Sequence, residues 1–154
     1  MKTEFEKAWL FACRVLTFRR RTRHELEKRL GQKGFSAGVA GHVLDMLAEY
    51  GYIDDNIFAC RWVEQRLGKK GIRGLKRELM EKGIRGEIVN EALGGLECDA
   101  EYGAALELIK KKLARRDEAY SLSRLAGLLN RRGFSSEVIG RVCRTMRDGW
   151  EDRF

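Results

Sequence analysis

The stretch LEKRLGQKGFSAGVAGHV, residues 26–43, is the first of three related stretches that decide the fold of this chain. It returns as LKRELMEKGIRGEIVNEA at residues 75–92 and as LAGLLNRRGFSSEVIGRV at residues 125–142. Each copy carries two leucines four residues apart and then a glycine. After the glycine, two apolar residues again stand four apart, which is helical spacing. A repeat of about 50 residues indicates a tandem array of small units that bury their apolar faces against one another.

Each unit is predicted to consist of three helices. In the first unit, Thr22 and Glu25 have the spacing of a capping box that opens the second helix. Gly34 suits the left-handed conformation that ends this helix, and Ser36 is a good N-cap for the third helix. The predicted helices span residues 4–18, 23–32, 37–49, 55–67, 72–81, 86–94, 99–115, 122–131 and 136–149.

The predicted fold class is therefore all-α, with three tandem three-helix repeats that form an elongated, curved array. The first repeat and its N-terminal lead-in occupy residues 1–52, the second repeat 53–96, and the third, with a C-terminal cap, 97–154. The residue after each repeated glycine is expected to plug the corner between the second and third helices. These corner residues are Phe35, Ile84 and Phe134.

Composition restricts the possible partners. The 154 residues include 31 Lys and Arg against 23 Asp and Glu, a formal net charge of +8, and no proline. Nucleic acid or an acidic protein groove is the expected partner, and a merely basic solvated surface is the alternative. No apolar run reaches the roughly 18 residues of a membrane span, and the N-terminus carries early acidic residues, unlike a signal peptide. We therefore expect a soluble cytoplasmic protein with no membrane partner.

Basic residues cluster at the junction between the first and second helices of each repeat. Because equivalent positions in an array face similar directions, these clusters are expected to form one stripe that binds the partner. The stripe consists of Arg19, Arg20, Arg21, Arg23, Lys69, Lys70, Arg73, Lys110, Lys111, Lys112, Arg115 and Arg116.

The sequence offers little support for catalysis or for a cofactor. The pair Asp54-Asp55 is explained as an N-cap and a first-turn acid, and residues 68–71 lack the spacing of a phosphate-binding P-loop. Cys13 and Cys60 occupy the same place in two repeats, which predicts small buried side chains rather than a disulfide or a metal site. We expect no enzyme, no cofactor and no bound metal.

Three stretches together resemble one known family. They are RRTRHELEKRLGQKGF at residues 20–35, GYIDDNIFACRWVEQR at residues 51–66, and KGIRGLKRELMEKGI at residues 70–84. They are similar to the first two repeats of RecX regulatory proteins, and the third repeat and the N-terminal lead-in match more loosely. The similarity extends over essentially the whole chain.

The resemblance implies an all-helical, curved molecule that binds the RecA recombinase and its filament on DNA. Proteins of this family act in DNA repair, recombination and the SOS response. They lie in the groove of the filament and dampen the ATPase, strand-exchange and coprotease activities of RecA. The resemblance supplies no catalytic motif, and filament binding requires only a monomer.

Two other functions remain open from the residues alone. The chain could be a sequence-nonspecific DNA-binding module that contacts phosphates with a steep salt dependence. It could also be a helical adaptor for another protein, in which case its positive charge would be incidental. An enzyme is the least supported class.

Overall fold

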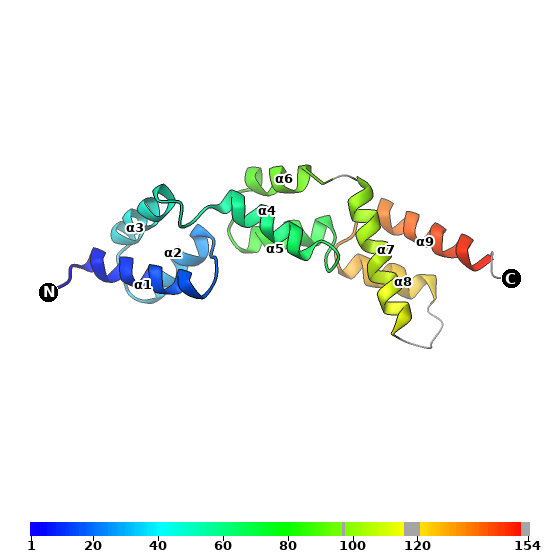
Figure 1. The fold of residues 1–154 in the computed structure, drawn as a ribbon, viewed down its shortest axis with the longest axis horizontal. Coiled ribbons are helices and arrows are strands. Elements are labelled where there is room, and N and C mark those ends of the chain that lie inside the picture. The colour runs from blue at the N-terminus through cyan, green and yellow to red at the C-terminus, as the bar shows by residue number, and fades with distance from the viewer. Residues whose placement is uncertain (97, 116–120, 152–154) are drawn as a thin grey trace. The chain divides into compact units, whose positions relative to one another are not determined.

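The computed structural model describes residues 1–96, 98–115 and 121–151, and in these residues the chain is all-α (Figure 1). The predicted helix boundaries agree with the observed ones to within two residues. The helices are α1 (Glu4–Phe18), α2 (Arg23–Gln32), α3 (Ala37–Glu49), α4 (Asp55–Arg66), α5 (Ile72–Glu81), α6 (Gly86–Gly94), α7 (Cys98–Ala114), α8 (Leu122–Arg131) and α9 (Ser136–Glu151).

The chain divides into two compact units, and the division passes through α4, α5 and α6. Unit 1 comprises Met1–Arg61 and Leu79–Val89, and unit 2 comprises Trp62–Glu78 and Asn90–Phe154. Each helix of the middle repeat therefore contributes one part to each unit.

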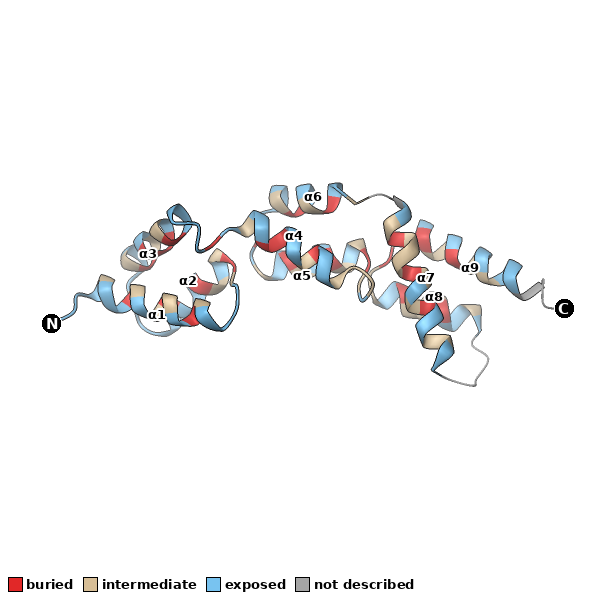
Figure 2. Ribbon diagram, in the orientation of Figure 1, coloured by how far each residue is buried: buried red, intermediate tan, exposed pale blue. Residues whose placement is uncertain are grey.

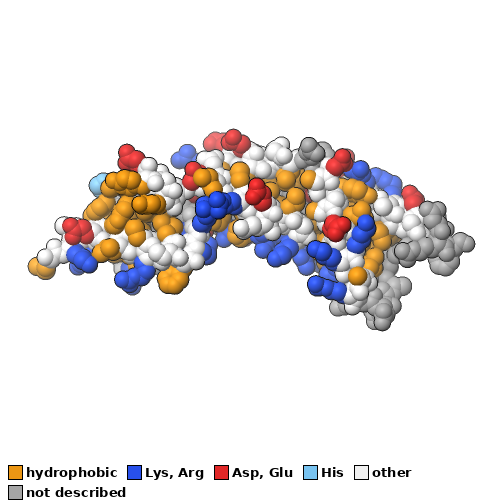
Figure 3. Space-filling model, in the orientation of Figure 1, with side chains coloured by type: hydrophobic (Ala, Val, Ile, Leu, Met, Phe, Trp, Pro, Cys, Tyr) orange, Lys and Arg blue, Asp and Glu red, His pale blue; other side chains and the backbone are white. Residues whose placement is uncertain are grey.

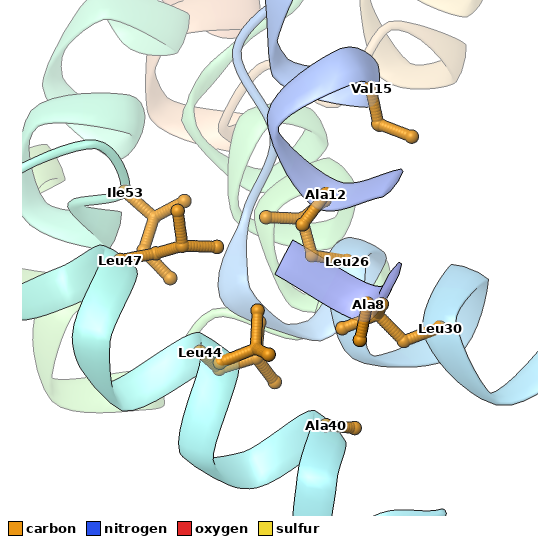
Figure 4. Close-up of a cluster of buried hydrophobic side chains, with 10 residues drawn as sticks. Ala8, Ala12, Val15, Leu26, Leu30, Ala40, Leu44, Leu47 and Ile53 are labelled. Atoms are coloured by element: carbon orange, nitrogen blue, oxygen red, sulfur yellow. The ribbon is translucent and has the colours of Figure 1, made fainter. Parts of the chain in front are cut away.

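The core of the first repeat lies in unit 1 and is built from the predicted apolar faces of α1, α2 and α3 (Figure 4). Small alanines of α1 allow this helix to pack closely against the leucines of α2 and α3. Full burial of each leucine contributes about 1.5–3 kcal/mol of transfer free energy. The buried side chains are Ala8, Ala12, Val15, Leu26, Leu30, Ala40, Val43, Leu44, Leu47 and Ile53.

Helix ends in unit 1 follow the local signals in the sequence. Thr22 and Glu25 form the predicted capping box, and the side chain of Ser36 accepts a hydrogen bond from the backbone of Val39. Gly34 ends the turn after α2 with a φ of 94°, a left-handed conformation that glycine adopts without a Cβ clash. The capping predictions for α2 and α3 are confirmed.

Unit 2 holds the core of the third repeat, and Figure 2 shows buried positions on each of its helices α7, α8 and α9. Phe134 is fully buried at the corner between α8 and α9, as predicted. Ile84, in unit 1, is buried at the equivalent corner of the second repeat, whereas Phe35 is only half-buried. The buried core residues of the third repeat are Ala105, Ile109, Leu125, Leu129, Phe134, Val138 and Val142.

In unit 1, the first turn of α2 docks onto residues of the second repeat. The hydroxyl of Thr22 donates a hydrogen bond of 2.8 Å to the carbonyl oxygen of Lys82, in the corner after α5. The backbone N–H of Arg23 donates to Oδ1 of Asp55, at the start of α4, over 3.0 Å. A carboxylate from the second repeat thus satisfies a helix-terminal N–H group that has no partner within α2.

Unit 2 repeats this arrangement between α5 and the third repeat. The N–H of Gly71 donates to the carbonyl oxygen of Arg132 over 2.9 Å. The N–H of Ile72 donates to Oε1 of Glu101, on α7, over 3.2 Å. The same oxygen accepts the N–H of Ser135 at 3.0 Å, and Oε2 accepts its hydroxyl at 3.1 Å. Glu101 is 3% exposed and connects two repeats through three hydrogen bonds.

The two docking carboxylates occupy equivalent places in their repeats. Asp55 precedes the buried Ala59 by one helical turn, and Glu101 precedes the buried Ala105 by the same spacing. In the first repeat this place belongs to Ala8, which is completely buried in the core. The carboxylate is therefore present only in the two repeats that receive a preceding helix.

The prediction for the repeated cysteines is wrong for one of them. Cys13 packs partly against the core of the first repeat, but Cys60 is exposed. In both helices the preceding alanine, Ala12 or Ala59, takes the fully buried position, and one further residue turns the cysteine side chain by about 100° around the helix axis. Partly buried Cys13 still contacts the core, whereas Cys60 does not have this cover.

None of the helices in the described part of the chain combines the length and hydropathy that a bilayer crossing requires. The described residues also contain no group of three or more His, Cys, Asp and Glu side chains arranged to hold a metal ion.

Candidate binding surface

The first basic cluster lies in unit 1, in the loop between α1 and α2, and surrounds one carboxylate. Arg19 Nη2 lies 2.9 Å from Glu25 Oε2, and Arg21 Nη1 lies 3.8 Å from the same oxygen. Lys82 Nζ approaches Oε1 of Glu25 at 4.0 Å. Arg20 is exposed. Arg20 is therefore the member of the loop best placed to meet a partner without breaking the cluster.

Electrostatics around Glu25 favour its ionised form. Burial by itself would raise the pKa of this carboxyl, but the backbone N–H of Thr22 and the cations Arg19 and Lys82 lower it below the ordinary value. Burial, together with repulsion from the neighbouring Arg19, lowers the pKa of Arg21. The Nε of Arg21 is buried, and none of the described residues accepts a hydrogen bond from it.

Arg23 forms an ion pair within unit 1. Its guanidinium Nη2 lies 2.5 Å from Oδ1 of Asp45 on α3, in an ion pair whose side chains are 41% and 71% exposed. Exposed pairs of this kind contribute about 0–1 kcal/mol. A partner could therefore replace Asp45 at little cost.

The second cluster lies in unit 2, in the loop between α4 and α5. Lys69 is exposed and Lys70 is half-buried. Arg73, also predicted to bind a partner, donates hydrogen bonds to Asn130 Oδ1 at 3.0 Å and to the carbonyl oxygen of Phe134 at 2.6 Å. Arg73 therefore links α5 to the third repeat.

A neighbouring basic residue of unit 2 is neutralised internally. Arg66 donates to both oxygens of Glu78 at 2.9 Å, and the indole of Trp62 donates to Oε2 at 2.8 Å. Burial would raise the pKa of Glu78, but these donors and Lys70 lower it below its ordinary value. The bidentate geometry joins the end of α4 to α5.

The third cluster occupies the C-terminal half of α7, where Figure 3 shows Lys and Arg side chains gathered on the surface. Lys110, Lys111 and Arg115 are exposed, and Lys112 is half-buried. Arg116 lies outside the described residues.

Unit 2 brings the second and third clusters together at Arg132, which sequence reasoning missed. Its guanidinium Nη1 donates to the carbonyl oxygen of Lys69 at 3.0 Å, and its side chain lines a cavity with Lys111 and Lys112. A signal was present, because Lys33 and Lys82 also stand immediately before a repeated glycine. The cation before the glycine thus recurs in all three repeats.

The repeats differ in how they balance this charge. Three residues after the N-cap of the second helix stand Glu25, Gly74 and Arg124, in chain order. Only the first repeat has a carboxylate at this place, and there it lies among Arg19, Arg21 and Lys82. The second and third repeats have no carboxylate at this place, and Glu78, a carboxylate near the second cluster in the described part of unit 2, pairs with Arg66.

Tandem three-helix repeats with cationic clusters near the junction of the first and second helices of each repeat define a helical repeat protein with a basic surface. Residues 8–47 match the family model described as RecX, first three-helix domain, and residues 54–93 match RecX, second three-helix domain. The chain belongs to the RecX family of regulatory proteins.

Individual relatives are similar over most of their length. The regulatory protein RecX of Mycobacterium ulcerans is 40% identical over 143 residues, which cover 89% of this chain and 83% of the relative. RecX of Mycobacterium tuberculosis (strain ATCC 25177 / H37Ra) is 38% identical over 146 residues, with 89% and 84% covered.

A solved structure shares the fold. The crystal structure of RecX from Lactobacillus salivarius matches with a TM-score of 0.82 at 22% identity, covering 94% of this chain and 97% of that chain.

Proposed function

We propose that this protein binds the RecA nucleoprotein filament in its helical groove and inhibits the ATPase, strand-exchange and coprotease activities of RecA. Membership of the RecX family carries this proposal. Three separate basic clusters are consistent with it, because a filament offers acidic protein surface and DNA phosphates at regular intervals. Several weak contacts made by one chain reinforce one another.

The twelve basic residues named above are proposed to form the stripe that contacts the filament, and a cytoplasmic monomer is sufficient for this role. Within the stripe, Arg20 and Lys69 are the sharpest probes because they are exposed and their side chains are not among the ion pairs described above. Replacing Arg73 would confuse binding with stability, because its guanidinium holds Asn130 and Phe134.

The test is the rate of ATP hydrolysis by RecA on single-stranded DNA as this protein is titrated in. Binding to naked DNA is measured in the same buffer. Inhibition well below the concentration that saturates naked DNA supports regulation of the filament. Inhibition that appears only when naked DNA is saturated indicates competition for DNA, and the alternative of a sequence-nonspecific DNA-binding helical module would replace this proposal.

Charge reversal locates the binding surface. Arg20→Glu and Lys69→Glu are each expected to weaken inhibition by at least about tenfold if a charge-assisted contact is lost. Lys28→Glu, on an exposed position of α2 outside the stripe, is the matched control. If Arg20→Glu and Lys69→Glu inhibit RecA as well as the control Lys28→Glu does, with unchanged helicity, the basic stripe is excluded as the binding surface.

A further inference from the structure

A cavity of about 360 Å³ opens beside the C-terminal half of α7 in unit 2. Its described lining is Leu108, Lys111, Lys112, Arg115 and Arg132. Leu108, Lys111 and Lys112 belong to α7, and their spacing i, i+3 and i+4 places them on one face of the helix. Arg115 follows the end of α7. Among the described residues that line the cavity, four of the five side chains are cations and none is a carboxylate.

The guanidinium of Arg132 is held in place by the chain opposite it. Its Nη1 donates to the carbonyl oxygen of Lys69 at 3.0 Å, and the carbonyl oxygen of Arg132 accepts from Gly71 at 2.9 Å. Arg132 is half-buried, as is Lys112 across the cavity. The conformational entropy of the Arg132 side chain has thus partly been lost before any ligand arrives, which favours binding.

Helix dipoles explain only part of this charge. Lys111 and Lys112 lie in the last turn of α7, where a cation gains about 0.3–1 kcal/mol from the partial negative charge of the helix end. That gain does not require four cations to share one hollow, where like charges repel one another. An anion in the hollow would relieve this repulsion.

We propose that this cavity binds a phosphate group. A single carboxylate carries one negative charge and two acceptor oxygens. The four cations of the cavity carry more positive charge and more hydrogen-bond donors than one carboxylate can match. Phosphate offers several acceptor oxygens, so the planar guanidinium of Arg132 and the point charges of Lys111 and Lys112 can bind it together. Leu108 forms an apolar wall that limits competing water.

This inference deepens the proposed function, on which it rests for treating the α7 cluster as a binding surface. Its test contains no RecA, so the two can fail separately. Binding of a fluorescent single-stranded oligonucleotide is measured by anisotropy over a range of salt concentrations, and inorganic pyrophosphate is titrated as a competitor. Far-ultraviolet circular dichroism checks that each variant is folded.

The decisive comparison is Lys112→Gln against Lys110→Gln. Both remove one positive charge from α7, but Lys110 does not line the cavity. Lys112→Gln is expected to weaken oligonucleotide binding about tenfold more than Lys110→Gln. It should also reduce the slope of log K against log salt by about 0.7, the value for one phosphate contact with a single strand. Lys111→Gln, on the exposed rim, tests the same site if Lys112→Gln is unstable.

The two probes distinguish the sources of phosphate. If pyrophosphate displaces the oligonucleotide from the natural protein and Lys112→Gln weakens both, the site takes backbone phosphates of nucleic acid. If Lys112→Gln weakens only pyrophosphate, the site takes free polyphosphates. Equal effects of Lys110→Gln and Lys112→Gln on both probes would show a diffuse positive field and overturn the phosphate site.

Discussion

Replacing Glu101 by alanine is expected to destabilise unit 2 substantially. The carboxylate accepts hydrogen bonds from the N–H groups of Ile72 and Ser135 and from the hydroxyl of Ser135. Truncation leaves two backbone donors without a partner, and each costs about 1–3 kcal/mol. Because Ile72 and Ser135 are only half-buried, water can reach them in part, and we expect a total loss of about 3 kcal/mol.

Thermal and urea unfolding followed by far-ultraviolet circular dichroism measures this loss. A loss of about 3 kcal/mol corresponds to a fall in Tm of about 6–12 °C for a chain of this size. Glu101→Gln keeps one oxygen for the two N–H groups but removes the charge, so about half of the loss is expected. Glu107→Ala, an exposed position on the same helix, is the matched control.

The reasoning is refuted if Glu101→Ala unfolds within about 0.5 kcal/mol of Glu107→Ala, the range of ordinary surface substitutions. That result would mean that water satisfies the donors of Ile72 and Ser135 as well as the carboxylate does. The contact between α5 and the third repeat would then depend on apolar packing alone.

Three further predictions concern residues with contrasting partners. The pKa of Glu78 is lowered in the fold, so its stabilisation is present above the unfolded pKa of about 4.3 and is lost as pH falls through the folded pKa. The urea midpoint of the natural protein should therefore fall more steeply than that of Glu78→Gln between about pH 7 and about pH 3, and parallel profiles would contradict this. Gly133→Ala should cost about 2 kcal/mol more than Gly34→Ala in urea unfolding, because a Cβ at Gly133 would clash with the backbone nitrogen of Gly74 whereas Gly34 faces open space. Equal losses would show that left-handed strain alone decides both. Arg73→Ala should lose about 1–2 kcal/mol of unfolding free energy while Lys69→Ala stays within about 0.5 kcal/mol, and the opposite order would show that the Arg73 hydrogen bonds contribute no stability.

Helix positions could be predicted because their causes are local in sequence. Thr22 and Glu25 cap α2 through groups three residues apart, and Gly34 ends the following turn through its own φ. Leu26 and Leu30 lie on one face because helical geometry places them there, whatever the partner of that face is. The boundaries of nine helices in the described residues follow from such signals.

Which side chains of a helix are buried and which are exposed was harder to predict. Cys13 and Cys60 stand in identical four-residue stretches, yet one is half-buried and the other exposed. The difference depends on which neighbouring helices cover each face. That information is distributed over distant parts of the chain and cannot be read from the repeated stretch.

For the candidate binding surface too, some features could be predicted from the sequence and others depend on the tertiary structure. Residue counts and spacing alone identify three basic clusters and a net charge of +8, because charge is a property of composition. Tertiary structure decides which cations are available to bind a partner, because Arg73 is held by Asn130, 57 residues away in sequence. It also joins α5 to the third repeat through Glu101 and Ile72, which are 29 residues apart. It also makes Arg132 the meeting point of two clusters. Local sequence therefore determines where helices begin and end, whereas long-range contacts determine which of the charged side chains remain free to bind.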